Sequence, residues 1–179
     1  MTIGPAYPQL IRLLLRLPRL VLFHRQKAAP ISCIMPTISP RHPYRLGRSR
    51  TGLGLFATKP IRKGDFIIKY WGRRIANKLA DEIDNRYLFE INSRWTVDGA
   101  TRRNIARYIN HSCRPNAESD VVKGEILITA IKNIAPGDEI TYDYGKDHFE
   151  GFIKPKGCQC EKCREKRRAA RKAKRNGRR

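Results

Sequence analysis

The amino-acid sequence predicts a mostly β domain of several small sheets with few short helices. Between Tyr44 and Tyr144, short runs of β-branched and aromatic residues alternate with turn-forming Gly, Pro, Asn and Asp. The chain has 179 residues, 40% of them hydrophobic, which suits one domain flanked by tails. No long helical periodicity separates the short runs, so alternating β-α-β units are not expected.

The expected elements follow one another closely along the chain. Residues 75–85 form the one expected helix, with Asn77 as its N-cap. Lys123-Gly124 is the expected turn of a hairpin, and residues 135–138 form another turn before the last strand. Strands are expected at residues 66–71, 87–91, 95–97, 121–122, 125–131 and 139–144, whereas Gly52-Leu53-Gly54 taken alone is expected to be a turn.

Positive charge is concentrated at the two ends of the chain. The net charge is +22, yet residues 44–161 carry 21 Lys and Arg against 15 Asp and Glu. Residues 1–43 hold six basic residues and no acidic one, and we expect them to be a poorly ordered basic extension. Their Leu- and Arg-rich run at 10–22 is too short and too charged to span a bilayer. An amphipathic transit segment or a membrane-surface helix is the alternative for this run.

The C-terminal tail, residues 164–179, is rich in Arg, Lys and Ala and is expected to be partly helical or disordered. Its charge makes it a candidate to bind the phosphate backbone of DNA or RNA. A solvated tail without a partner is the alternative.

Three cysteines lie within six residues, in the pattern C-x-C-x2-C formed by Cys158, Cys160 and Cys163. No signal-peptide pattern is present, so we expect a reducing, intracellular setting, where such a cluster more often binds metal than forms disulfides. A structural zinc ion needs four ligands. Cys113 is the remaining cysteine of the body and is the natural fourth ligand; buried free thiols are the alternative.

The segment Asn110-His111-Ser112-Cys113 also contains a candidate Cys–His nucleophilic pair. We do not favour a cysteine hydrolase, because neighbouring side chains on a strand point to opposite faces. A thiol that binds zinc is also not free to act as a nucleophile.

The order of the motifs resembles that of the SET-domain protein-lysine methyltransferases. RYINHSCRPN (107–116), then GDEITYDYG (137–145) and the cysteine cluster, are similar to the SET and post-SET modules of that family. TGLGLFA (51–57) and YWG (70–72) stand where the family has its first two motifs, and YLFEI (87–91) matches its inserted segment. The resemblance covers about residues 45–163. The short cysteine spacing and the short insertion are more similar to compact, bacterial-type members.

The resemblance implies a SET-domain fold over residues 44–145, followed by a zinc-binding post-SET segment over 146–163. In this family the last strand passes under an earlier loop in a pseudoknot, which breaks the usual rule against threading. That arrangement would place Asn110 and His111 beside Tyr144.

The resemblance also implies methyl transfer from S-adenosylmethionine to a lysine side chain, with zinc bound by Cys113, Cys158, Cys160 and Cys163. Tyr144 would be the catalytic tyrosine, Tyr70 a wall of the lysine channel, and Tyr142 the residue that limits the number of methyl groups. His111 would act mainly through its backbone, and Phe149 would cover the adenine. The implied cofactor-binding residues are Gly52, Leu53, Tyr87, Arg107, Asn110 and His111.

The implied methyl transfer to lysine and the basic charge of the chain together indicate a class of substrate. A basic protein repels a lysine-rich substrate unless nucleic acid bridges them, so we expect a histone or histone-like protein bound to nucleic acid. Tyr142 stands where trimethylating relatives tend to have Phe, so monomethylation is expected. We also expect a monomer without a transmembrane segment, in the cytoplasm or nucleoid of a bacterium or the nucleus of a eukaryote.

Two other classes of protein fit part of the sequence. A non-catalytic SET-like module would bind peptides or nucleic acid without turnover, and a basic zinc protein would bind nucleic acid. Neither explains why Tyr144 and the pair Asn110-His111 are all present.

Overall fold

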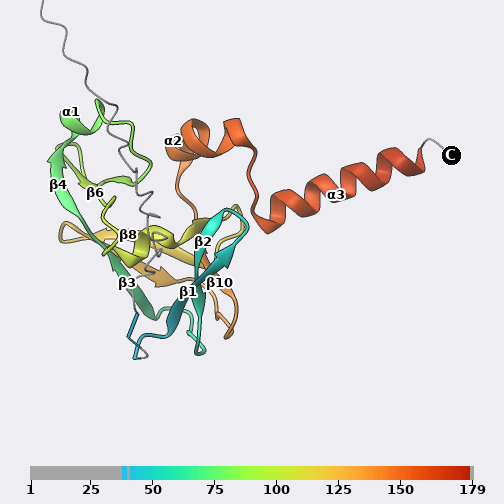
Figure 1. The fold of residues 1–179 in the computed structure, drawn as a ribbon, viewed down its shortest axis with the longest axis horizontal. Coiled ribbons are helices and arrows are strands. Elements are labelled where there is room, and N and C mark those ends of the chain that lie inside the picture. The colour runs from blue at the N-terminus through green and yellow to red at the C-terminus, as the bar shows by residue number, and fades with distance from the viewer. Residues whose placement is uncertain (1–37, 40, 178–179) are drawn as a thin grey trace, which may run out of the picture. The chain divides into compact units, whose positions relative to one another are not determined.

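The computed structural model describes residues 38–39 and 41–177. Most of the expected N-terminal extension, including the run at 10–22, lies outside these residues. Within the described part of the chain, the strands form three small sheets joined by short connections and single helical turns (Figure 1). This architecture confirms the predicted mostly β fold. None of the described helices is long and apolar enough to cross a lipid bilayer.

The four-stranded sheet brings together segments that are far apart in the sequence. Its strand order is β1-β2-β10-β7, with β10 antiparallel to β2 and parallel to β7. Tyr142 of β10 lies opposite His111 of β7, so the two motifs that the resemblance placed side by side are adjacent. The strands are β1 (Tyr44–Ser49), β2 (Gly52–Ala57), β7 (Asn110–His111) and β10 (Glu139–Tyr142).

The second sheet has the order β3-β9-β8 and contains the predicted hairpin. Its turn residues, Lys123 and Gly124, have φ angles of 52° and 78°. Positive φ at both central positions is typical of the two-residue turns that match the twist of the flanking strands. The strands are β3 (Phe66–Tyr70), β8 (Ala117–Val122) and β9 (Glu125–Ala130).

The third sheet, of order β4-β6-β5, shows that the predicted helix at 75–85 was too long. Only α1 (Asn77–Ala80) is helical, and Ile75 in β4 is buried opposite Thr96. Asn77 is not the N-cap, because its side chain bonds the Thr96 hydroxyl and the Asn92 carbonyl. Pairing across the sheet therefore outweighs local helix propensity. The strands are β4 (Arg73–Ala76), β5 (Leu88–Glu90) and β6 (Trp95–Asp98).

Helical segments connect the sheets and follow the last strand. A 3-10 turn, η1 (Ile105–Tyr108), leads into β7. After β10 come three consecutive short pieces, α2 (Lys146–His148), the π-helical turn η2 (Phe149–Ile153) and η3 (Lys154–Lys156). The predicted tail is largely one helix, α3 (Glu161–Asn176), which begins inside the cysteine cluster, and no residue of it is buried.

The core lies where the first two sheets pack together. Aliphatic side chains from β2, β9 and β10 and from the segment before β7 are almost completely buried. They alternate along β9 with more exposed residues, as expected for a strand with one face on a core. The largest of these side chains are Leu55, Ile109, Ile126, Ile128 and Ile140.

Candidate active site and cysteine cluster

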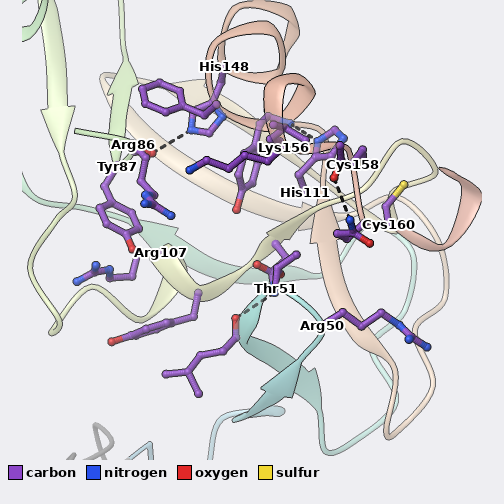
Figure 2. Close-up of a pocket in the computed structure, with 18 residues that line it drawn as sticks. Arg50, Thr51, Arg86, Tyr87, Arg107, His111, His148, Lys156, Cys158 and Cys160 are labelled. Atoms are coloured by element: carbon purple, nitrogen blue, oxygen red, sulfur yellow. Dashed lines mark hydrogen bonds between the residues drawn. The ribbon is translucent and has the colours of Figure 1, made fainter. Parts of the chain in front are cut away.

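Two cavities meet at the ring of Tyr144. The large cavity, of about 550 Å³, lies between the turn before β2, η1, β7 and the segment 152–160 (Figure 2). The smaller one, here called the tyrosine cavity, has about 330 Å³ and is lined by side chains of β3, β5 and β10. A group bound in one cavity would therefore lie next to a group bound in the other. The residues that line both are Arg86, Tyr87, Arg107, Tyr144 and His148.

Four tyrosines, Tyr70, Tyr87, Tyr142 and Tyr144, line the tyrosine cavity. The Tyr70 hydroxyl donates to the carbonyl oxygen of Tyr87 at 2.8 Å, and the Tyr144 hydroxyl donates to that of Ile109 at 2.6 Å. The rings of Tyr142 and Tyr144 are 4.9 Å apart between centroids. Within the described residues no hydrogen bond holds the Tyr142 hydroxyl, which leaves it able to bind a ligand atom or a water molecule.

Burial keeps these hydroxyls protonated. Desolvation raises the pKa of Tyr70, of Tyr142 and of Tyr144 above the usual value of 10. The neighbouring Tyr144 raises the pKa of Tyr70 further, and the positive charge of Arg107 only partly opposes this. All three tyrosines are therefore neutral hydrogen-bonding groups over the physiological pH range.

Gly99 and Asn104 hold the segment that packs against the Tyr70 ring, and sequence analysis did not identify either residue. The Gly99 amide donates to the Tyr87 carbonyl at 3.0 Å, the same oxygen that accepts the Tyr70 hydroxyl. The fully buried Asn104 donates to the Gly99 carbonyl at 3.2 Å. A Cβ at Gly99 would lie 2.3 Å from the Tyr70 hydroxyl oxygen, so only glycine fits there. No motif marks these positions, because their contacts exist only after β3 and β6 are assembled.

Arg107 brings a positive charge to both cavities. Its guanidinium lies 3.9 Å from the centre of the Tyr87 ring (Figure 2) and donates to the Ala100 carbonyl. Its Nε is buried without a hydrogen-bond partner, and no described carboxylate forms an ion pair with it. A buried donor without a partner calls for an explanation, and an anionic ligand group in the large cavity would supply one.

Asn110 connects β2 to β10. Its amide nitrogen donates to the Leu53 carbonyl at 3.0 Å and to the Glu139 carboxylate at 2.7 Å. Leu53 and Asn110 both line the large cavity. Gly52, expected in a turn, is instead the first residue of β2, and it has a φ of 121°, which residues with a side chain rarely adopt. The sequence-predicted residues Leu53 and Asn110 thus form one corner of the large cavity, whereas Gly52 is not among the residues that line it.

The His111 side chain is part of the site, whereas the resemblance gave the main role to its backbone. Its Nδ1 accepts the Tyr144 amide at 3.3 Å, and its Nε2 lies 3.3 Å from the Cys113 sulfur. Burial lowers the pKa of His111, and the nearby Asp143 partly opposes this. The side chains of His111 and Cys113 lie on the same side, because the two residues are two positions apart. The expectation that they would point to opposite faces was wrong.

The segment after β10 closes the large cavity with residues that sequence analysis missed. The ring of His148 lies 4.7 Å from that of Tyr144, and its Nε2 donates to the Arg86 carbonyl at 2.9 Å. Phe152 lines the large cavity, whereas Phe149, the residue predicted to cover the adenine, packs its ring 5.3 Å from that of His111.

The four body cysteines converge, as their spacing predicted. Their sulfur atoms all lie within 4.8 Å of one another, with Cys113 3.7 Å from Cys163 and 3.9 Å from Cys158. Burial raises the pKa of Cys158 to about 11. Burial also acts to raise that of Cys160, but backbone hydrogen bonds from Cys113 and Cys163 outweigh it and lower the pKa to about 7. Four converging thiols, one of them readily ionised, match the donor set of a structural zinc site.

Comparisons with known proteins agree with this geometry. The SET-domain family model matches residues 52–145. Histone-lysine N-methyltransferase trithorax of Drosophila virilis is 40% identical over 126 residues, and human histone-lysine N-methyltransferase 2D is 40% identical over 128 residues. Each alignment covers 64% of this chain but only 3% and 2% of the relative, so the chain spans a small part of these proteins.

A similar solved structure is that of the Chaetomium thermophilum PRC2 in an autoinhibited conformation bound to S-adenosylmethionine. It has a TM-score of 0.51 and 31% sequence identity, and it covers 58% of this chain and 15% of that one. The family model therefore spans more than half of the chain, from the first residue of β2 to the residue after Tyr144. The chain belongs to the SET-domain family.

Proposed function

We propose that this protein transfers a methyl group from S-adenosylmethionine to the side-chain amine of a lysine in a protein substrate. The meeting of a cofactor-sized cavity and an aromatic cavity at Tyr144 carries this proposal. The SET-domain match and relatives named histone-lysine N-methyltransferase support the reaction type.

The large cavity suits S-adenosylmethionine. When bound there, this cofactor supplies an electrophilic methyl group on a sulfonium. The Arg107 guanidinium, whose Nε has no hydrogen-bond partner, is placed to bind a carboxylate, and the corner formed by Leu53 and Asn110 offers polar groups at close range. A volume of about 550 Å³ is in the range of pockets that enclose small-molecule ligands.

The tyrosine cavity suits a lysine side chain. Its buried aromatic walls disfavour the ammonium form, which helps the lysine to arrive as the neutral amine that methyl transfer needs. Tyr144, whose hydroxyl is fixed by the Ile109 carbonyl, is the proposed catalytic tyrosine, and Tyr70 is the opposite wall. Catalysis then consists mainly of holding two reactants in line.

Monomethylation is the proposed main product. Tyr142 lines the tyrosine cavity and its hydroxyl is not held by another described residue. That hydroxyl, or a water molecule on it, would fill the space into which a methylated amine must rotate to present its lone pair again.

Zinc is the proposed metal of the cysteine cluster. Cys113, Cys158, Cys160 and Cys163 would hold it, and its role would be structural, because four thiolates leave no position for a substrate. The bound metal would fasten the segment after β10 to the loop after β7. Metal analysis of the purified protein should give one zinc ion per chain, and a protein that folds and binds cofactor without metal would contradict the assignment.

The proposed substrates are histones or histone-like proteins bound to nucleic acid, which places the protein at chromatin. The relatives are named as histone-lysine enzymes, one group of them specific for H3 lysine 4. The similar solved structures are of a complex, PRC2, which favours assembly with other proteins over the predicted monomer. Light scattering on the purified chain would measure its own oligomeric state.

A cofactor-binding and a transfer assay together test the enzyme against a non-catalytic module. We expect S-adenosylhomocysteine to bind in calorimetry and labelled methyl groups to reach mixed histones. Tyr144→Phe should retain binding and lose transfer. Binding without transfer on any histone would favour the non-catalytic module, and no binding at all would contradict the proposed use of the large cavity.

We also propose that α3 binds the phosphate backbone of DNA or RNA. Four arginines, spaced four, three and four residues apart, lie on one side of the helix, whereas its three alanines lie on the opposite side together with Lys162 and Lys166. The helix contains no aromatic residue and no Leu, Ile or Val, so it lacks the apolar anchors of a protein interface. The four arginines are Arg164, Arg168, Arg171 and Arg175.

The double variant Arg168→Gln, Arg171→Gln tests this arginine row against a charge-matched control. Arg102→Gln, Arg103→Gln removes the same charge from an exposed loop outside α3. Loss of two phosphate contacts should weaken duplex DNA binding and lower the slope of log affinity against log salt by about 2, whereas the control should keep the slope. Equal losses in the two variants would show that net charge, and not the arginine row, causes binding.

A further inference from the structure

We propose that the imidazole of His111 is a positioning residue that couples the cysteine cluster to the cofactor cavity. This inference rests on the proposed function of the two sites and adds a link between them. One ring nitrogen faces the Cys113 sulfur, and the other accepts the backbone amide of Tyr144, the residue at which the two cavities meet.

The hydrogen bonds define one tautomer of the ring. Nδ1 accepts the Tyr144 amide at 3.3 Å, so it carries a lone pair and no proton. In the neutral imidazole the proton then resides on Nε2, which lies 3.3 Å from the Cys113 sulfur and donates to it. Among the described residues, the one carboxylate within 4 Å of Nδ1 is that of Asp143, which is 60% exposed and 3.6 Å away, beyond hydrogen-bonding distance.

The ring is held in place from both sides. Its side chain is only 5% exposed. The ring of Phe149 packs 5.3 Å away, and the ring of Tyr144 lies edge-on at 5.6 Å. His111 also pairs with Tyr142 through the backbone of β7 and β10. The imidazole therefore cannot turn without disturbing the aromatic wall of the site.

The two ring nitrogens of His111 act on different parts of the site. At Nε2, donation to the sulfur stabilises the charge of a thiolate and orients it toward its metal, as groups around metal ligands generally do. At Nδ1, acceptance of the Tyr144 amide fixes the backbone that positions the Tyr144 ring. The imidazole thus links the cysteine cluster to Tyr144, in addition to the direct contact that Cys158 and Cys160 make as lining residues of the large cavity.

Two substitutions separate the two ends of the ring. The amide oxygen of His111→Asn is placed near the Nδ1 position and can still accept the Tyr144 amide. The amide nitrogen of His111→Gln reaches toward the Nε2 position and can still donate to the Cys113 sulfur. The measurements are the rate of zinc loss to a chelator and the affinity for S-adenosylhomocysteine.

One variant should lose zinc more easily, and the other should bind S-adenosylhomocysteine more weakly. His111→Asn should release zinc about 10- to 100-fold faster, the usual effect of removing a group that supports a metal ligand. Because this variant lacks the contact with Cys113, its affinity for S-adenosylhomocysteine should depend less on bound zinc than that of the wild type. His111→Gln should keep its zinc and bind S-adenosylhomocysteine more weakly. Similar behaviour of both variants in both measurements would overturn the coupling.

Nuclear magnetic resonance of the wild-type ring gives a readout that does not depend on the variants folding. Long-range proton–nitrogen spectra should show His111 protonated at Nε2 only, with a shift when zinc is removed. A proton on Nδ1, or no response to zinc, would overturn the proposal while leaving the methyltransferase assignment intact. A wild-type protein that binds no S-adenosylhomocysteine would instead refute the proposed function itself.

Discussion

Replacing Gly99 with alanine is expected to displace Tyr70 and slow methyl transfer while leaving cofactor binding nearly unchanged. The added Cβ would lie 2.3 Å from the Tyr70 hydroxyl oxygen and 2.4 Å from two of its ring carbons. Optimal contacts between carbon atoms are about 3.5–4.0 Å, so the ring has to move by roughly 1 Å. Tyr70 is 5% exposed, so it has little free space to enter.

Two magnitudes follow from this clash. Overpacking of a buried site costs about 1–3 kcal/mol of the free energy of unfolding. Misplacement of a positioning group by about 1 Å can reduce kcat/KM by about 10²-fold. The affinity for S-adenosylhomocysteine should change little, because Tyr70 lines the tyrosine cavity and not the large cavity.

The assays are peptide methylation kinetics, calorimetry with S-adenosylhomocysteine, and thermal unfolding. Gly151→Ala is the matched control, since a Cβ there would meet no atom within 4 Å and its φ is ordinary. It should behave as the wild type in all three assays. Wild-type kinetics in Gly99→Ala, or an equal loss of cofactor binding, would refute the role assigned to Tyr70.

Three further predictions concern the tyrosines. Tyr142→Phe removes a hydroxyl but keeps the aromatic wall, so mass spectrometry of a methylated peptide should show a shift toward di- and trimethyl-lysine; unchanged products would contradict its role. Tyr144→Phe loses the bond to the Ile109 carbonyl and should reduce kcat by about 10²-fold or more, as loss of an orienting hydrogen bond does in other enzymes. Burial raises the pKa of Tyr70 and Tyr144 above 10, so they stay protonated as pH rises. The rate should therefore climb with substrate deprotonation from pH 7 to about 10, and a falling limb below pH 9 would refute this.

Local sequence signals predicted those elements whose conformation depends on neighbouring residues. The hairpin at Lys123-Gly124 follows from a turn that needs two residues with positive φ, and the structure contains it. The helix predicted at 75–85 failed because the buried Ile75 gains more from pairing with β6 than from local helix propensity. The segment 146–156 has no periodic pattern, and its turns depend on aromatic contacts to Tyr144 and His111.

Many residues of the site could be predicted from the sequence, but the contacts between them could not. The motifs located Tyr144, Arg107 and the four cysteines, because their spacing resembles that of one family. The contact between His111 and Cys113 was missed, although side chains two positions apart on an extended segment lie on the same side. Gly99 and Asn104 gave no signal, since their role depends on strands that are distant in the sequence.

Mass spectrometry of histones incubated with the purified protein and S-adenosylmethionine would show whether the protein is a lysine methyltransferase. We expect lysine side chains to gain methyl groups, mainly one each. The variant Tyr144→Phe should lose most of this methylation while still binding S-adenosylhomocysteine. A zinc-loaded, cofactor-binding protein that leaves every histone lysine unmodified, free or on nucleosomes, would contradict this expectation.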